Sequence, residues 1–197
     1  ARFDERDAVG GGGVAYGALT WTPGRLHLDR NLSAIDSATA HSAGTYNKLN
    51  LDLARDQAVH QSWSVYGRLS VQWANKNLDS SEKFGLGGPN GVRAYPVGEG
   101  FGDKGWLAQL ETRYAMGSFS PYAFYDVGSV HYNTSPWLKA EAAQNTRTIA
   151  GAGVGTRYRL QRWTFDASLA WRTVGGHPLT DTSDTIPRIW VSATYRF

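Results

Sequence analysis

One arginine stands in the middle of a long, glycine-rich apolar stretch. Arg93 lies within residues 84–105, FGLGGPNGVRAYPVGEGFGDKG, where the glycines and prolines exclude a regular helix or strand. A structureless loop of about 20 residues is uncommon in a compact domain and is usually functional or disordered. Disorder is disfavoured by the large apolar side chains of the stretch, which are Phe84, Leu86, Val92, Tyr95, Val97 and Phe101. We expect this loop to pack against the rest of the protein and to deliver Arg93 to a partner.

Other residue types that could do chemistry form no catalytic, cofactor-binding or metal-binding pattern. The chain has no cysteine, and its five histidines lack the spacing of metal ligands. Residues 100–105 match G-x-G-x-x-G, but a strand pattern rather than a helix follows them, so a dinucleotide site is not expected. Glu111 and Asp166 could face each other, but ion pairs with nearby arginines are the simpler interpretation, the candidates being Arg113, Arg157 and Arg172. We expect no enzyme activity and no cofactor.

The elements around the loop are predicted to be strands, because apolar and polar residues alternate with a period of two almost everywhere. About eight strands are expected after a polar lead-in at residues 1–7, and they fall within residues 14–29, 45–54, 63–73, 106–114, 122–132, 146–160, 163–172 and 189–197. Short turns are expected at residues 55–60, 116–118 and 161–162. Long polar connections are expected at residues 31–42, 133–144 and 175–187, in addition to the central stretch. Long and short connections therefore alternate strictly along the chain.

This pattern is typical of a transmembrane antiparallel β-barrel. Each strand is near or above the roughly 9–11 residues that a tilted strand needs to cross a bilayer, and outer-membrane barrels alternate long outer loops with short periplasmic turns. The apolar faces end in aromatic residues, in a chain with 8 Trp, 10 Tyr and 7 Phe, as interfacial girdles require. The opposite faces carry charges that suit a wet lumen. A net charge of +3, scattered along the chain, argues against a nucleic-acid partner.

The segment at residues 78–95, LDSSEKFGLGGPNGVRAY, resembles the signature of two-partner secretion transporters, the haemolysin and filamentous-haemagglutinin secretion/activation proteins. The resemblance continues through FYDVGSV at residues 124–130, GAGVGTRY at 151–158 and the terminal WVSATYRF. It implies a bacterial outer-membrane protein of the barrel-assembly superfamily that transports a secreted exoprotein. The implied partners are the lipid bilayer, that exoprotein and the outer-membrane barrel assembly machinery.

The resemblance also implies a site. In this family the loop that carries VRGY folds back into the lumen, and here Val92–Tyr95 reads VRAY, with Ala94 in place of glycine. The arginine of the loop pairs with the aspartate of an F-x-D-x-G motif, which assigns Arg93 to Asp126 and places Phe124 and Gly128 beside it. Val92 and Tyr95, with Phe101, would pack around this latch. Tyr195 and Phe197 match the carboxy-terminal assembly signal of such barrels.

The chain is shorter than the implied parent, which has roughly sixteen strands preceded by POTRA domains and a plug helix. We expect residues 1–197 to form a single barrel or half-barrel domain, with residues 76–105 as its long loop. Three arrangements stay open: self-association of two copies, a small closed barrel with the loop expelled, and pairing with a missing amino-terminal half. The expected function is translocation of an unfolded exoprotein across the outer membrane. The alternative is a structural eight-stranded barrel without transport activity.

Overall fold

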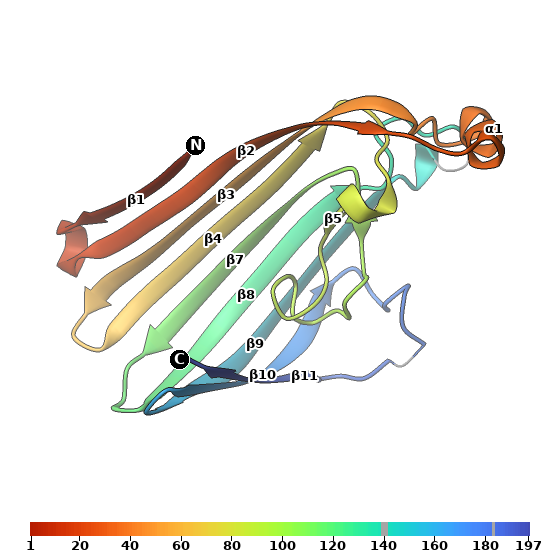
Figure 1. Cartoon of the computed structure of the whole chain (residues 1–197). Helices are drawn as coiled ribbons and strands as arrows, with labels where there is room; N and C mark the ends of the chain where they lie inside the picture. The colour runs from red at the N-terminus through yellow and green to blue at the C-terminus, as the bar shows by residue number, and fades with distance from the viewer. Residues whose placement is uncertain (139–141, 183) are drawn as a thin grey trace.

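Nine antiparallel strands form one continuous sheet in the computed structural model, which describes residues 1–138, 142–182 and 184–197. The strands follow one another in chain order and pair only with their sequence neighbours (Figure 1). They are β1 (Arg2–Asp7), β2 (Gly13–Leu26), β3 (Gly44–His60), β4 (Trp63–Ala74), β7 (Lys104–Tyr114), β8 (Phe119–His131), β9 (Thr146–Leu160), β10 (Trp163–Val174) and β11 (Arg188–Tyr195). Such an up-and-down order is the wall of a β-barrel, as the sequence predicts.

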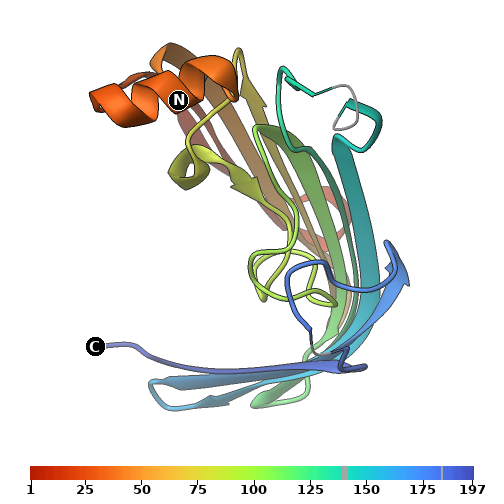
Figure 2. The ribbon, with the colours of Figure 1, turned by 90° about the vertical axis from the view of Figure 1, so that its right-hand side faces the viewer.

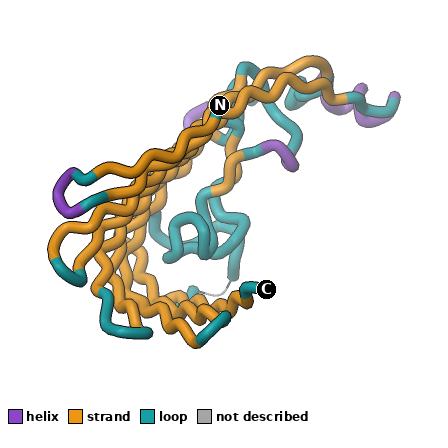
Figure 3. The backbone as a smooth tube through the Cα atoms, turned by 60° about the vertical axis from the view of Figure 1, so that its left-hand side comes forward, coloured by secondary structure: helices purple, strands orange, loops and turns teal. Residues whose placement is uncertain are grey.

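The sheet is strongly curved, and the long connections gather at one end of it (Figures 1 and 2). The helix α1 (Arg30–Ala38) lies in the connection between β2 and β3, and a 3₁₀ turn, η1 (Val9–Gly11), joins β1 to β2. The central loop was expected at residues 76–105 and is the connection 75–103 in the structure, because β7 already begins at Lys104. It contains the 3₁₀ turn η2 (Ser80–Glu82) and a small ladder of β5 (Phe84–Gly85) with β6 (Phe101–Gly102). It folds back onto the concave face of the sheet (Figure 3). The described residues contain no helix that is long and apolar enough to cross a membrane.

The two faces of the sheet differ in polarity as the alternating sequence pattern requires. The convex face exposes large apolar side chains from strand after strand, for example Leu69 and Trp73 on β4 and Leu169 and Trp171 on β10. The concave face carries polar and charged residues, among them Arg68, which alternates with Leu69. This arrangement suits a wall with lipid outside and water inside.

Two parts of the chain differ from the sequence prediction. Residues 2–7 were expected to be a polar lead-in, but they form β1, which pairs with β2 from Arg2↔Ala18 to Asp7↔Gly13. Residues 55–60 were expected to be a turn, but β3 continues to His60 and the turn follows at residues 61–62. Polar side chains of the two segments pair with each other, so their polarity does not end the strand. The clearest case is Arg55, whose guanidinium donates two hydrogen bonds to Asp7, at 2.8 and 3.0 Å.

The first and last strands each use only one of their two edges. Among the described residues β1 pairs with β2 alone and β11 with β10 alone, so the nine strands form an open arc. The arc holds the central loop on its concave side, so the loop is not expelled as it would be from a small closed barrel. The predicted loops at residues 133–144 and 175–187 are connections in the structure, although residues 139–141 and 183 lie outside the described part.

Candidate functional site

The middle of the central loop is buried against the inner face of β7 to β10. Leu86, Val92 and Tyr95 are fully buried, and Ala94 is nearly so. They join a cluster with inward-facing residues of the wall, which are Leu107, Tyr122, Phe124, Val130, Ile149 and Ala170. This cluster is the main apolar core of the described chain, so the loop is part of the folded structure and not a solvated linker.

The loop keeps its shape through its own backbone hydrogen bonds. The amide of Leu86 donates to the carbonyl of Gly100 at 3.1 Å, and the amide of Val92 donates to the carbonyl of Leu86 at 2.7 Å. Gly91 is required where these segments touch, because an added Cβ would lie 1.9 Å from the carbonyl oxygen of Leu86. Gly87 is required for the same reason, since its Cβ would lie 2.1 Å from the carbonyl oxygen of Pro96.

Arg93 is the residue through which the loop contacts the most strands. Its Nε and Nη2 donate to the two carboxylate oxygens of Asp126 at 2.8 and 2.7 Å, and its backbone amide donates to Asp126 at 3.1 Å. Its Nη1 donates to Glu111 at 2.6 Å. The indole of Trp190 on β11 donates to its carbonyl at 2.7 Å. Because Arg93 is 5% exposed and Asp126 is 0% exposed, this is a buried, bidentate ion pair.

Glu111 extends this pair into a larger charge cluster on the concave face. Its carboxylate accepts hydrogen bonds from three guanidinium groups, those of Arg93, Arg113 and Arg157. Arg157 also donates to Asp166 at 2.8 Å, which in turn accepts a hydrogen bond from the hydroxyl of Tyr122. The pairing of Glu111 with Arg113 and Arg157 is the one expected from the sequence, whereas Arg172 pairs with Asp184 instead. Opposite charges therefore compensate one another where water is scarce.

Each residue of the F-x-D-x-G motif has its own contact with the loop. The ring of Phe124 lies under the guanidinium of Arg93, with 3.5 Å between its centroid and Cζ. Asp126 holds the charge. Gly128 leaves room for the loop, because an added Cβ would lie 2.6 Å from Leu86 Cδ2. The motif therefore gives the loop a ring on which Arg93 stacks, a carboxylate that binds Arg93, and a position without a side chain where Leu86 packs.

The alanine that replaces glycine in VRAY fits because a glycine faces it. An added Cβ at Gly151 on β9 would lie 2.3 Å from the Cβ of Ala94. The next two inward glycines of β9 make similar room, Gly153 for the ring of Phe124 and Gly155 for the ring of Tyr122. The spacing of these glycines is apparent in the sequence, but the sequence does not show which side chains pack against them.

Two further contacts were not expected from the sequence. Trp190, described above, binds the backbone of Arg93 from β11. Asp103, at the end of the loop, is fully buried and accepts hydrogen bonds from the amides of Leu78 and Thr134 at 3.1 and 2.7 Å. It also pairs with Lys83 at 3.0 Å. Asp103 thus links the end of the loop to its beginning at Leu78. In the sequence Asp103 belongs to the G-x-G-x-x-G match at residues 100–105, which does not indicate this role.

Two residues of the loop lie differently from the expectation. Phe101, which was expected to pack around Arg93, is 44% exposed, and Val97, one of the apolar residues taken as a sign that the loop is packed, is 67% exposed. Phe101 belongs to β6, where its ring packs over Gly85 of the partner strand β5, away from the wall. The remaining predicted residues, Tyr195 and Phe197, lie at the end of β11, where Tyr195 contacts Trp163 with ring centroids 5.1 Å apart. Their role in assembly stays a prediction.

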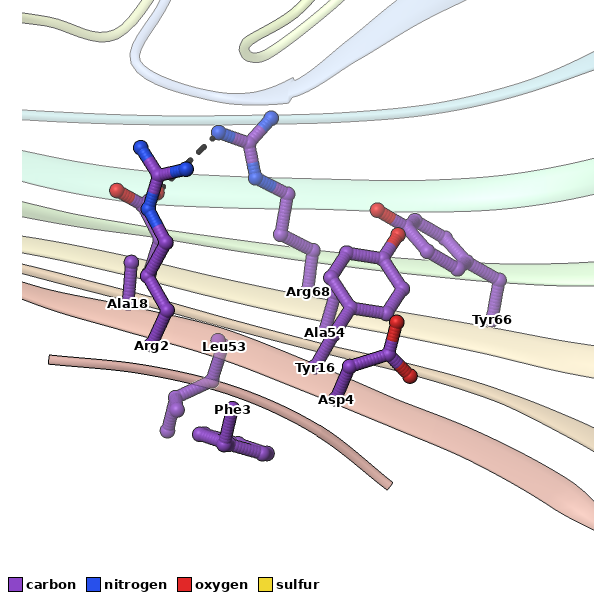
Figure 4. A pocket seen from close by; sticks show the side chains of 11 residues that line it. Arg2, Phe3, Asp4, Tyr16, Ala18, Leu53, Ala54, Tyr66 and Arg68 are labelled. Carbon is purple, nitrogen blue, oxygen red and sulfur yellow. Dashed lines mark hydrogen bonds and ion pairs between the residues drawn. The ribbon is translucent and has the colours of Figure 1, made fainter. Parts of the chain in front are cut away.

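The loop fills only part of the concave face. Over β1 to β4 the face is open and forms a hollow of about 790 Å³. Figure 4 shows Arg2, Tyr16, Tyr66 and Arg68 pointing into this hollow. Arg68 has an exposed ion pair with Asp52 at 3.3 Å. The lumenal surface thus has one half occupied by the loop and one half lined by polar side chains that the loop does not cover.

The described residues contain no group of three or more histidine, aspartate or glutamate side chains arranged to hold a metal ion. The carboxylates of the site are instead engaged with arginines. Their arrangement supports anchoring of a loop and contact with a polar chain.

Comparison with known proteins points to one family. The sequence model of the haemolysin secretion/activation proteins ShlB/FhaC/HecB matches residues 8–158. The heme/hemopexin transporter protein HuxB of Haemophilus influenzae (strain 86-028NP) is 30% identical over 114 residues. A second heme/hemopexin transporter protein HuxB, from Haemophilus influenzae, is 30% identical over 111 residues. The matched part covers 55% of this chain and 20% of the first of these relatives, so the chain spans about a fifth of their length.

A solved structure with the same fold supports the barrel architecture. CdiB from Escherichia coli superimposes with a TM-score of 0.68 over 96% of this chain and 34% of its own, at 15% sequence identity. At this level of identity the likeness concerns the fold alone. The nine-stranded arc therefore has the fold of about a third of that chain.

Proposed function

The chain belongs to the haemolysin secretion/activation protein family ShlB/FhaC/HecB, a family of Gram-negative outer-membrane proteins, and from this premise we propose that it is the transporting wall of a two-partner secretion barrel. In this proposal the substrate is an unfolded exoprotein, and the transport uses neither nucleotide nor metal. The chain supplies part of the barrel, and its remaining wall comes from further strands that pair with the free edges of β1 and β11.

The observation that carries the proposal is the buried Arg93–Asp126 contact on the concave side of a membrane wall. A long glycine-rich loop loses much conformational entropy when it docks, and the ion pair with its surrounding core offsets that loss. A loop held in this way fills the half of the lumen beside β7 to β11. The open half over β1 to β4 then offers a path for an extended polypeptide.

The side chains of the open half suit such a path. Tyr16, Tyr66, Arg2 and Arg68 present hydroxyl and guanidinium donors, which can bind the carbonyl groups of any extended backbone. The hydroxyl and guanidinium groups that point into the hollow of Figure 4 would bind backbone groups that every polypeptide has, so these contacts would be weak and independent of sequence. Weak, repeated contacts allow a chain to move through.

Planar-bilayer conductance of the barrel whose wall is completed by the strands that pair with β1 and β11 tests the proposal. A transporting barrel with a partly open lumen is expected to give discrete ion currents, and Arg93→Ala is expected to increase the open time or the step size because the loop is released. Leu69→Ala, on the convex face of β4, is the matched control and should not change the current. If both the wild type and Arg93→Ala are silent, the chain is a structural barrel without a conducting lumen, which is the alternative function.

A further inference from the structure

A second buried acidic residue fixes the central loop at a different place. Glu99, six residues after Arg93, is 1% exposed. Its Oε2 accepts hydrogen bonds from the amides of Leu179 and Thr180 at 2.8 and 3.2 Å and from the Thr180 hydroxyl at 3.0 Å. These donors belong to the connection between β10 and β11, at the end of the sheet where the long connections gather.

Arg147, near the start of β9, completes this arrangement. Its Nε and Nη2 lie 3.0 and 2.8 Å from Glu99 Oε1, so one carboxylate oxygen faces the wall and the other faces the connection. The same guanidinium donates to the carbonyls of Gly175 and His177 at 2.7 and 3.0 Å. A buried charge pair therefore organises the backbone of a segment that has no regular structure of its own.

The partners of Glu99 and those of Arg93 are separate. Arg93 contacts Asp126, Glu111 and Trp190, on β8, β7 and β11. Glu99 contacts β9 and the β10–β11 connection. Within the loop, the amide of Gly87 donates to the carbonyl of Glu99 at 3.0 Å, which ties Glu99 to the first arm of the loop. Tyr95, two residues after Arg93, also contacts this connection, because its hydroxyl lies 2.7 and 2.9 Å from the carbonyl oxygens of Val174 and Gly176. The amides of Leu179 and Thr180, by contrast, are held by Glu99.

We propose that Glu99 and Arg147 are positioning residues that form a second anchor, which holds the β10–β11 connection onto the central loop through groups that Arg93 does not contact. When the Arg93 contacts are lost, the loop pivots about Glu99 and stays within the lumen. The β10–β11 connection keeps its shape because its carboxylate partner does not move. This inference depends on the contacts of Glu99 and does not require the chain to transport anything.

Hydrogen exchange followed by mass spectrometry can separate the two anchors in the protein purified from outer membranes. In Glu99→Gln the amides of residues 175–182 are expected to exchange about tenfold faster or more, since charge-assisted hydrogen bonds to Leu179 and Thr180 are weakened. Residues 89–95 should keep their protection. In Arg93→Lys the reverse is expected, with faster exchange at residues 89–95 and unchanged exchange at residues 175–182.

Three further variants make the result specific. Glu82→Gln changes a carboxylate of the same loop that pairs with Lys48, and it should leave residues 175–182 unchanged. The neutral pair Glu99→Gln with Arg147→Gln should be no less stable than either single variant, because each single variant leaves one buried charge unpaired and the double variant leaves none. Thr180→Val removes only the hydroxyl donor and serves as the milder variant if Glu99→Gln does not fold.

Two results would overturn the second anchor. One is unchanged exchange at residues 175–182 in folded Glu99→Gln, or in Thr180→Val if the first variant does not fold. The other is release of both segments by Arg93→Lys alone, which would show that the loop has one anchor and that Glu99 follows it. A protein that conducts no ions would leave the interpretation of the exchange data unchanged.

Discussion

At the scale of single residues, the site works because small residues stand where the loop comes closest to the wall. Gly128 faces Leu86, and Gly151 faces Ala94. A side chain larger than hydrogen at these places would push the loop away and lengthen the contacts of Arg93. The ion pair of Arg93 therefore depends on the close packing of uncharged residues around it.

Gly128→Ala is expected to destabilise the protein by about 1–3 kcal/mol, the usual result of overpacking a filled core. The added Cβ would lie 2.6 Å from Leu86 and 2.8 Å from the Trp106 carbonyl oxygen, neither of which has free space. The matched control is Gly67→Ala on β4, where an added Cβ meets nothing within 4 Å. Urea unfolding in lipid bilayers measures both, and equal midpoints for the two variants would show that Leu86 does not need this space.

Asp36 gives a pH-dependent prediction outside the membrane. It is buried at the end of α1 and accepts hydrogen bonds from the hydroxyl and amide of Ser42 and from the amide of Ala43. Burial raises the pKa of Asp36, but these hydrogen bonds and the charge of Lys76 outweigh it, so the pKa is lowered below its ordinary value of 3.8. Its stabilising contribution is therefore fully present above pH 3.8 and disappears as the pH falls through the lowered value.

The amide chemical shifts of Ser42 and Ala43 should titrate with a midpoint below 3.8. Asp36→Asn should abolish this titration while the far end of the sheet keeps its shifts. A midpoint at or above 3.8 in the wild type would show that the three hydrogen bonds are not maintained in solution.

At the scale of elements, alternation predicts the strands inside the bilayer and fails at their ends. Residues 55–60 were interpreted as a turn because Arg55, Asp56 and Gln57 are polar on both faces of the strand. Both faces are wet once a strand leaves the hydrocarbon layer, so the alternation disappears while the hydrogen-bond ladder continues. The same reason hid β1, in which every residue except Phe3 is charged.

The site shows a similar limit. Arg93 and Asp126 could be named from sequence because each belongs to a recognisable motif. Glu111 and Trp190 could not be named as partners of Arg93, because their height on the wall depends on the stagger between strands. Only the register of β7, β8 and β11 brings these inward residues level with the loop.

Leu169 lies on the convex face of β10, so a charge placed there is expected to destabilise the barrel. Leu169 is exposed in the middle of β10, so Leu169→Arg is expected to destabilise the barrel by about 2–4 kcal/mol in lipid. Leu160, which is also exposed but lies at the end of β9, is the matched position, and Leu160→Arg should cost about 0–1 kcal/mol. Equal losses at both positions would contradict a midplane location for Leu169.

At the scale of the whole molecule, the alternation of connections gives the arc an orientation. The long connections with α1 and the central loop share one end, and the short turns share the other (Figure 1). In outer-membrane barrels the short turns face the periplasm.

A cysteine at Ser37, on α1, is therefore expected to react with a membrane-impermeant maleimide added to intact cells. A cysteine at Ser118, in the turn between β7 and β8, should react only after the cells are broken. Both positions are exposed, so burial does not limit either reaction. Labelling of Ser118→Cys but not Ser37→Cys in intact cells would invert the orientation.

The central claim is that a buried ion pair anchors the loop to the inside of the wall. A double-mutant cycle on Arg93→Ala and Asp126→Ala, read as free energies of unfolding in lipid, tests it most directly. Each single variant is expected to lose about 3–5 kcal/mol, because the partner charge is left buried and unpaired. The exposed pair Arg68–Asp52 is the matched control, with a coupling of about 0.2–1 kcal/mol.

For Arg93 and Asp126 the predicted coupling energy is at least about 1.5 kcal/mol, since the double variant removes both charges together. Glu111 keeps Arg113 and Arg157 as partners in every variant, so it does not mask the result. A coupling no larger than that of Arg68 and Asp52 would contradict the account, because it would show that the loop lies against the wall without being held by this pair.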